Sequence, residues 1–105
     1  MAMVVAVYKI SKSFPADEIY GLTSQMRRCA VSIPSNIAEG FGRGSTKDYV
    51  RFLRIATGSL YELQTQMEIC SRLGLIDRQG FEGLFESSRE IERMLSSLVR
   101  KVQRA

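Results

Sequence analysis

The stretch VSIPSNIAEGFGRG, residues 31–44, decides the fold, because it could be either a glycine-rich phosphate loop or part of a helix. A Walker loop requires GxxxxGK followed by Ser or Thr, and a dinucleotide loop requires GxGxxG after a strand. The glycines here have a GxGxG spacing, and Ile33, Ile37 and Phe41 recur every four residues. The stretch therefore indicates a helix that contains Pro34, and we predict that the proline bends it.

The rest of the chain shows the same helical pattern. Apolar residues recur at spacings of three and four in three long segments, and no comparable length alternates with period two. Prolines, glycines and capping residues place the helix ends, and the expected helices are about 2–13, 17–43, 46–73 and 78–104. Since the connections are short, neighbouring helices must run antiparallel. We predict an all-α, up-down four-helix bundle that occupies residues 1–105 as a single domain.

The first expected helix is much shorter than the other three. A helix of about 12 residues is ~18 Å long, whereas its partners would each span ~40 Å. Either the chain begins inside its first helix, or a partner covers the remaining length.

The second and third helices should form a hairpin that turns near residue 45. Facing positions in such a hairpin have residue numbers that add up to about 90, which places Gly58 and Ser59 opposite Ser32. A glycine in mid-helix is unfavourable by about 1 kcal/mol relative to alanine, so it needs a structural reason. We expect Gly58 to allow close approach of the two backbones beside Pro34.

The same register predicts polar contacts across the hairpin. Arg28 should lie opposite Glu62, Glu39 should lie opposite Arg51, and Asn36 falls on the apolar stripe. Asn36 and Glu39 could form a ligand or partner site, or they could belong to a buried polar network that selects one packing. The network is the favoured interpretation.

The composition argues against catalysis. The chain has no histidine, which removes the commonest general base, the usual partner of a nucleophilic serine or cysteine, and most transition-metal sites. Cys29 and Cys70 stand apart, and no apolar run approaches the ~18 residues of a membrane span. Without a recognisable signal peptide, we expect a cytoplasmic protein with reduced thiols. We predict no enzymatic activity, metal, cofactor, membrane association or small-molecule substrate.

The net charge is +4, and the expected fold distributes it unevenly. In an up-down bundle, the end of the second helix, the start of the third and the end of the fourth lie together. We call the seven cations there the basic tip: Arg43, Lys47, Arg51, Arg54, Arg100, Lys101 and Arg104. They predict binding to the backbone of RNA or DNA, without sequence-specific readout because no aromatic stacking platform is apparent. The alternative is a solvated surface on which Glu39 neutralises Arg51.

Several apolar residues lie off the main stripes of the third and fourth helices. They are Val50, Phe52, Ile55, Ile69, Phe85, Met94 and Val99. Some would widen the core, but so many favour a subunit interface and hence a homo-oligomer. A protein–protein adaptor that does not bind nucleic acid is the alternative function.

Three segments carry a family resemblance: FPADEIYGLTSQMRRCAVSIPSNIAEGFGR, KDYVRFLRIATGSLYELQTQMEI and LGLI. They resemble the bacterial four-helix-bundle family of 23S rRNA intervening-sequence proteins, which also includes the accessory variability proteins of diversity-generating retroelements. The resemblance covers residues 14–76 and is most specific in SIPSNIAEG, Ser32–Gly40, and GSLYELQTQ, Gly58–Gln66. It implies a protomer that commonly forms a ring-like homopentamer. It also implies a nucleic-acid-binding scaffold for a ribonucleoprotein or a reverse transcriptase.

Overall fold

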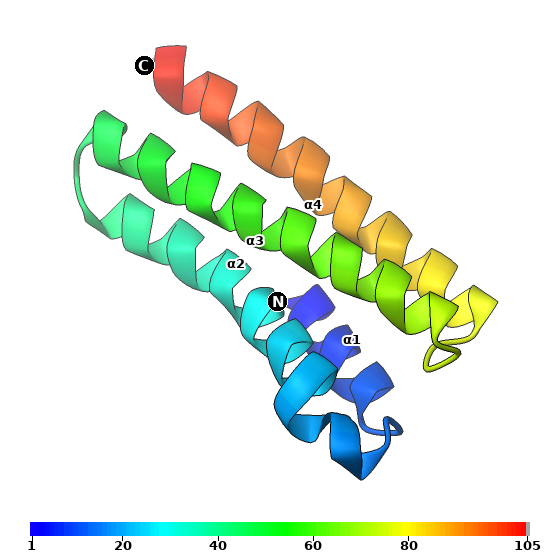
Figure 1. Ribbon diagram of the computed structural model, residues 1–105. Coiled ribbons are helices and arrows are strands. Elements are labelled where there is room, and N and C mark those ends of the chain that lie inside the picture. Colours follow the sequence, from blue (N-terminus) through cyan, green and yellow to red (C-terminus); the bar gives the residue numbers. More distant parts are fainter. Residues whose placement is uncertain (105) are drawn as a thin grey trace.

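The computed structural model describes residues 1–104, apart from the side chains of residues 18–20. Over this range the chain forms four α-helices and no strand, as predicted: α1 (Ala2–Ser11), α2 (Ser24–Gly42), α3 (Thr46–Arg72) and α4 (Arg78–Arg104). The helices α2, α3 and α4 alternate in direction, and α1 lies against one half of the bundle, in contact with α2 and α4 (Figure 1). The molecule measures 45 × 24 × 18 Å.

The start of the second helix differs from the prediction. A continuous helix from residue 17 is wrong, because Ala16–Glu18 forms a 3₁₀ turn, Ile19–Thr23 forms a π-helical turn, and α2 begins only at Ser24. The break lies at Gly21, whose φ of −101° and ψ of −109° are outside the helical region. From Ser24, α2 continues through Pro34 to Gly42, and the bend at the proline stays a prediction.

Glycines and capping side chains at the helix ends make the α2–α3 and α3–α4 connections short. Gly44 and Gly74, which follow α2 and α3, have φ values of +79° and +77°, a conformation that glycine adopts without strain. At the start of α3, the Ser45 hydroxyl accepts a hydrogen bond of 3.1 Å from the Asp48 amide. Before α4, the Asp77 carboxylate accepts one of 2.7 Å from a backbone amide. These turns make successive helices antiparallel.

The helix α3 lies at the centre of the core. Its predicted stripe is completely buried at Leu53, Ala56, Leu60, Leu63, Met67 and Cys70. These side chains pack against buried residues of the other three helices. Full burial of one large apolar side chain contributes about 1.5–3 kcal/mol, so this stripe fixes the orientation of α3.

The stripe of α2 loses its cover toward the turn with α3. Ile33 is 3% exposed, Ile37 is half-buried and Phe41 is 73% exposed, although all three have the same helical spacing. The chain that forms α1 begins beside Pro34, and its first residue lines a hollow of about 510 Å³ between α1, α2 and α4. Beyond this point α2 still packs on α3 through Gly40, but Phe41 lies on a face that α3 does not cover and is exposed.

The predicted register of the α2–α3 hairpin is confirmed at its centre, where the hydroxyls of Ser32 and Ser59 lie 2.9 Å apart. The role predicted for Gly58 is wrong, because this residue is exposed and a Cβ built on it would meet nothing within 4 Å. Close approach occurs instead at Gly40, where a Cβ would lie 2.7 Å from the Cβ of Phe52. Gly40 is therefore the residue that lets α2 and α3 pack tightly.

The predicted Glu39–Arg51 pair is also wrong. Glu39 pairs with Arg43 at 3.0 Å and Arg51 pairs with Asp48 at 3.6 Å, because partners one turn apart on the same helix are nearer.

Arg28 likewise uses its own helix, donating to the Ser24 hydroxyl at 3.4 Å. The carboxylate of Glu62 accepts a hydrogen bond from the Cys29 thiol across the hairpin at 3.2 Å. Cys29, the residue after Arg28 on α2, thus makes the contact with Glu62 that the register predicted for Arg28.

Asn36 belongs to a half-buried polar network rather than to an open site. Its amide nitrogen donates to the carbonyl and the hydroxyl of Ser32, at 2.8 and 2.9 Å. The Ser32 hydroxyl in turn contacts Ser59 on α3. The network links the two helices as the sequence analysis favoured, and Glu39 takes no part in it.

Candidate nucleic-acid interface

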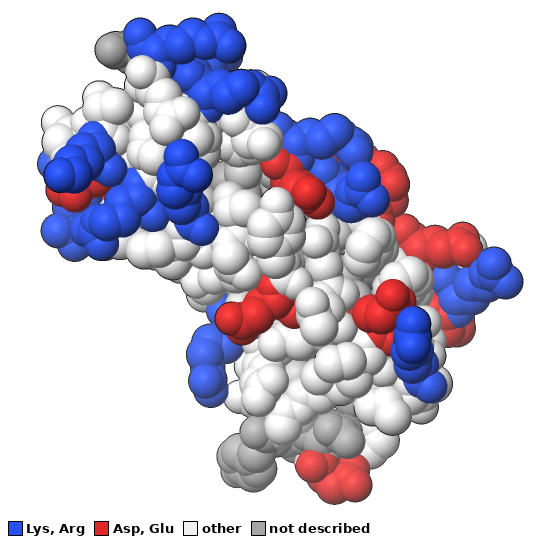
Figure 2. Space-filling model, turned by 45° about the horizontal axis from the view of Figure 1, so that its top comes forward, with Lys and Arg blue, Asp and Glu red and all other residues white. Residues whose placement is uncertain are grey.

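The seven residues of the basic tip lie at the same end of the molecule and are all exposed. Three helix ends contribute them: the end of α2, the beginning of α3 and the end of α4. Figure 2 shows lysine and arginine gathered at this end, whereas cationic and anionic side chains are mixed at the other end.

Arg43 and Arg51 are held against an aromatic ring. Their guanidinium carbons lie 5.0 and 4.5 Å from the centre of the Phe52 ring. Phe52 is buried, so it is one of the off-stripe apolar residues that widen the core. Both arginines also form the surface ion pairs with Glu39 and Asp48, and such pairs are weak enough to rearrange when an anion binds.

The other five cations of the tip form no ion pair among the described residues: Lys47, Arg54, Arg100, Lys101 and Arg104. Seven cations against the carboxylates Glu39 and Asp48 leave an excess of five positive charges at this end. The whole chain carries only +4, so the rest of the molecule is net negative by one charge. Such an asymmetry gives the basic tip a positive potential, which attracts anions.

Two cations of the tip meet in a surface hollow between α3 and α4, with a volume of about 460 Å³. We call it the α3–α4 groove. Its lining residues are Arg54, Thr57, Gly58, Tyr61, Glu92, Ser96, Val99 and Arg100. The groove extends the cationic surface from the tip along the side of the bundle.

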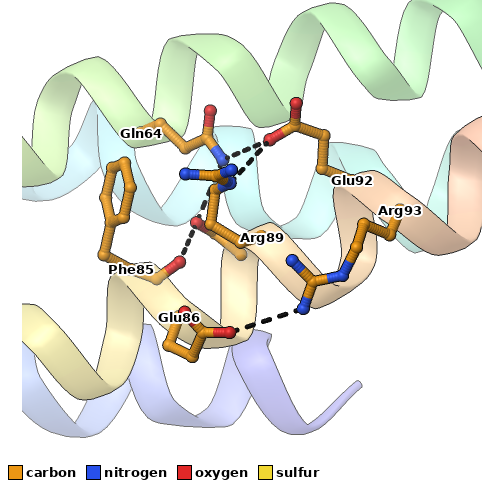
Figure 3. Close-up of polar contacts among 7 residues, drawn as sticks. Gln64, Phe85, Glu86, Arg89, Glu92 and Arg93 are labelled. Atoms are coloured by element: carbon orange, nitrogen blue, oxygen red, sulfur yellow. Dashed lines mark hydrogen bonds and ion pairs between the residues drawn. The ribbon is translucent and has the colours of Figure 1, made fainter.

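A polar cluster next to the groove fixes α3 against α4 (Figure 3). The amide nitrogen of Gln64 donates to the hydroxyl of Ser88 at 3.1 Å and to the carboxylate of Glu92 at 3.2 Å. Ser88 is completely buried, and its hydroxyl donates to the carbonyl of Phe85. In the sequence, the only indication of this cluster is that Ser88, a polar residue, falls within the apolar stripe of α4.

The cluster also determines the charge balance in the groove. Glu92 is the one carboxylate that lines the groove, and it accepts from Gln64 and pairs with Arg89 at 3.6 Å. Figure 3 shows both partners directed at the Glu92 carboxylate. Arg54 and Arg100 therefore have no carboxylate partner among the described residues.

Two aromatic side chains near the cations are exposed, which corrects the expectation that no stacking surface exists. Phe41 is 73% exposed at the end of α2, where its ring meets Tyr49 edge-to-face at 5.9 Å. Tyr61 is 51% exposed and lines the groove. Phe41 has the same spacing as Ile33 and Ile37, and this spacing alone does not show that its side chain is exposed.

The thiols are poorly suited to nucleophilic chemistry. Burial, reinforced by the hydrogen bond to Glu62, raises the pKa of Cys29 to about 11. Cys70 is buried, with its sulfur 3.3 Å from that of Met26. Within the described part of the chain, no group of three or more acidic or cysteine side chains could hold a metal ion. No described helix has both the length and the apolar character needed to cross a membrane.

Fold and site together define a small helical bundle with one cationic end. The chain belongs to the family described as 23S rRNA-intervening sequence protein, whose model matches residues 1–97. The match includes α1 and most of α4, beyond the segments on which the resemblance was based.

A solved structure supports the same assignment. A crystal structure of a protein with unknown function from the S23 ribosomal protein family of Bacteroides thetaiotaomicron VPI-5482 is similar, with a TM-score of 0.87. The two sequences are 25% identical, and the alignment covers 94% of this chain and 89% of that one. No curated protein matches the chain.

Proposed function

We propose that this protein is a non-enzymatic, homo-oligomeric bundle that binds the backbone of RNA or DNA through its basic tip. The observation that carries the proposal is the gathering of seven exposed cations from three helix ends, five of which form no ion pair within the described part of the chain. Phosphates that contact such residues release condensed counterions, which supplies most of the free energy of sequence-independent binding.

The proposed assembly is supported by apolar residues on the surface. Ile55, Ile69 and Met94 are exposed, and they belong to the surplus that the sequence singled out. Burying them between subunits would remove apolar surface from water. The ring-like homopentamer rests on the family resemblance, and a ring would place several basic tips side by side and strengthen their attraction for a polyanion.

The wider role that we propose is cytoplasmic scaffolding of a ribonucleoprotein or reverse-transcriptase partner. It rests on the resemblance to retroelement accessory proteins. The basic tip would hold the nucleic acid, and the apolar surface would remain for subunits or for the partner protein.

The alternative function is a protein–protein adaptor that does not bind nucleic acid. The hollow between α1, α2 and α4 favours it, because this site of about 510 Å³ is lined mostly by apolar residues that include Ile37, Ile91 and Met94. Such a site is suited to an apolar side chain of another protein.

Charge reversal at the tip tests the proposal. The variant Lys47→Glu, Arg54→Glu, Arg100→Glu, Lys101→Glu should lose RNA and DNA binding, measured by anisotropy of a labelled oligonucleotide, because four of the unpaired cations become repulsive. Circular dichroism and light scattering should show unchanged helicity and assembly, since all four side chains are exposed.

The matched control reverses four exposed cations outside the tip: Lys9, Lys12, Arg72 and Arg78. It has the same net charge as the tip variant and should retain most of the binding. Equal losses in the two variants would mean that net charge, and not the basic tip, determines affinity.

Nuclease treatment separates the adaptor from the nucleic-acid scaffold. Proteins captured with the full chain should be released when nuclease removes RNA and DNA. Partners that remain bound to the tip variant, with or without nuclease, would favour the adaptor.

A further inference from the structure

The α3–α4 groove connects the basic tip to an exposed aromatic ring. Arg54 and Arg100 line it together with Tyr61, which follows Arg54 by two turns of α3, a distance of about 10 Å along the helix. Tyr61 is exposed to solvent over about half of its surface. The groove therefore combines two cations and a π-face, which is the combination that single-strand-binding proteins use.

The two arginines are available to a phosphate. Neither forms an ion pair among the described residues, and the carboxylate that lines the groove with them, Glu92, is already bound to Gln64 and Arg89 (Figure 3). An incoming phosphate would not have to displace a carboxylate, so its binding would cost little rearrangement.

Gly58 leaves the floor of the groove open between the cation and the ring. It lies one turn from Arg54 and one turn from Tyr61, and a Cβ at this position would meet nothing within 4 Å. A mid-helix glycine is unfavourable by about 1 kcal/mol relative to alanine, and no contact within the described chain requires one here. Its absent side chain lets a ligand approach the backbone of α3.

The dimensions of the groove suit a single strand. A hollow of 460 Å³ falls in the size range of small-ligand sites. The bases of a duplex are paired and stacked, so one of them could reach Tyr61 only after unstacking, at a cost of a few kcal/mol. A duplex could therefore contact the tip with its phosphates, but only an unpaired base can stack in the groove without this cost.

We propose that the α3–α4 groove binds an unpaired nucleotide of a single-stranded nucleic acid. The phosphate lies between Arg54 and Arg100, the base stacks on Tyr61, and the hydroxyls of Thr57 and Ser96 line the same hollow. This inference rests on the proposed function and makes it narrower, because it gives single strands an advantage over duplexes of equal charge.

A tryptophan at position 61 reports stacking directly, since the chain has no natural tryptophan. Emission of Tyr61→Trp should be quenched by an oligothymidylate, and not by its duplex with oligoadenylate or by inorganic polyphosphate. Leu73→Trp is the matched control, because Leu73 is exposed at the far end of α3. Its emission should not respond to the single strand.

Affinity measurements test the same contact independently. Tyr61→Ala should weaken single-strand binding by about 5- to 150-fold, the equivalent of one stacked base, and leave polyphosphate binding unchanged. Gly58→Gln should weaken single-strand binding by filling the groove. Gly83→Gln, at the other open mid-helix glycine, should have no effect because Gly83 lies outside the groove.

Three outcomes would overturn the inference. If the single strand binds with tip-dependent affinity but Tyr61→Ala binds equally well and Tyr61→Trp is not quenched, the groove is not the site, and the proposed function stands. If no polyanion binds to the wild-type chain, the proposed function fails together with the groove. If the emission of Tyr61→Trp shifts to shorter wavelength with rising protein concentration alone, another copy covers the groove.

Discussion

At the scale of single residues, the Cys29 thiol shows how the fold determines reactivity. Burial and the Glu62 carboxylate raise its pKa from 9.0 to about 11, because both disfavour the thiolate. The neutral thiol donates its hydrogen bond to Glu62 across the α2–α3 hairpin. The carboxylate partner could not be predicted from the sequence, which placed Arg28, not Cys29, opposite Glu62.

The raised pKa predicts how stability depends on pH. Between pH 9 and 11 the unfolded chain loses the Cys29 proton while the folded chain keeps it, so the stabilising contribution, complete below pH 9, is lost as the pH rises. The expected slope from this group is a decrease of roughly 1 kcal/mol in unfolding free energy per pH unit. Urea denaturation of the wild type and of Cys29→Ala across this pH range measures this slope. The difference between the two proteins isolates the contribution of Cys29 from that of the tyrosines and lysines, which both proteins share. Parallel curves for the two proteins would contradict the assignment.

At the scale of helices, the sequence predicted best where every local signal agreed. The helix α3 has a complete apolar stripe, an N-cap at Ser45 and a glycine at its end, and its bounds match the prediction within one residue. The start of α2 was missed because the apolar periodicity continues across Gly21, and a glycine within a periodic segment does not show whether the helix breaks there. Burial along α2 depends on which of its residues the other helices cover, and the sequence of α2 alone does not show this.

The roles of the glycines also depended on tertiary structure. Gly40→Ala should destabilise the protein by about 1–3 kcal/mol, because the new methyl group would overlap Phe52 and push α2 away from α3. Gly58→Ala is the matched control and should instead stabilise the protein by up to about 1 kcal/mol, because its methyl group enters open space. Chemical denaturation measures both changes. A Gly40→Ala protein as stable as the wild type would contradict the close approach.

At the scale of the whole molecule, the up-down order of the helices brings distant cations together. Residues 43–54 and 100–104 are far apart in sequence but occupy the same end of the bundle (Figure 1), and the sequence pattern was sufficient to predict this. The α3–α4 groove was not predicted. Its existence depends on the positions of Arg54 and Arg100 across two helices and on the capture of Glu92 by Gln64 and Arg89, which spacing does not show.

The salt dependence of binding tests the basic tip most directly, because its slope counts the phosphates that the cations neutralise. If the five unpaired cations each contact one phosphate, log Kd should rise with log salt concentration with a slope of about 3.5 on single strands and 4.5 on duplexes. Charge reversal of Lys47, Arg54, Arg100 and Lys101 should bring the slope close to zero, while reversal of the four control cations should change it little. A wild-type slope near zero, or equal slopes in the two variants, would contradict binding through the tip.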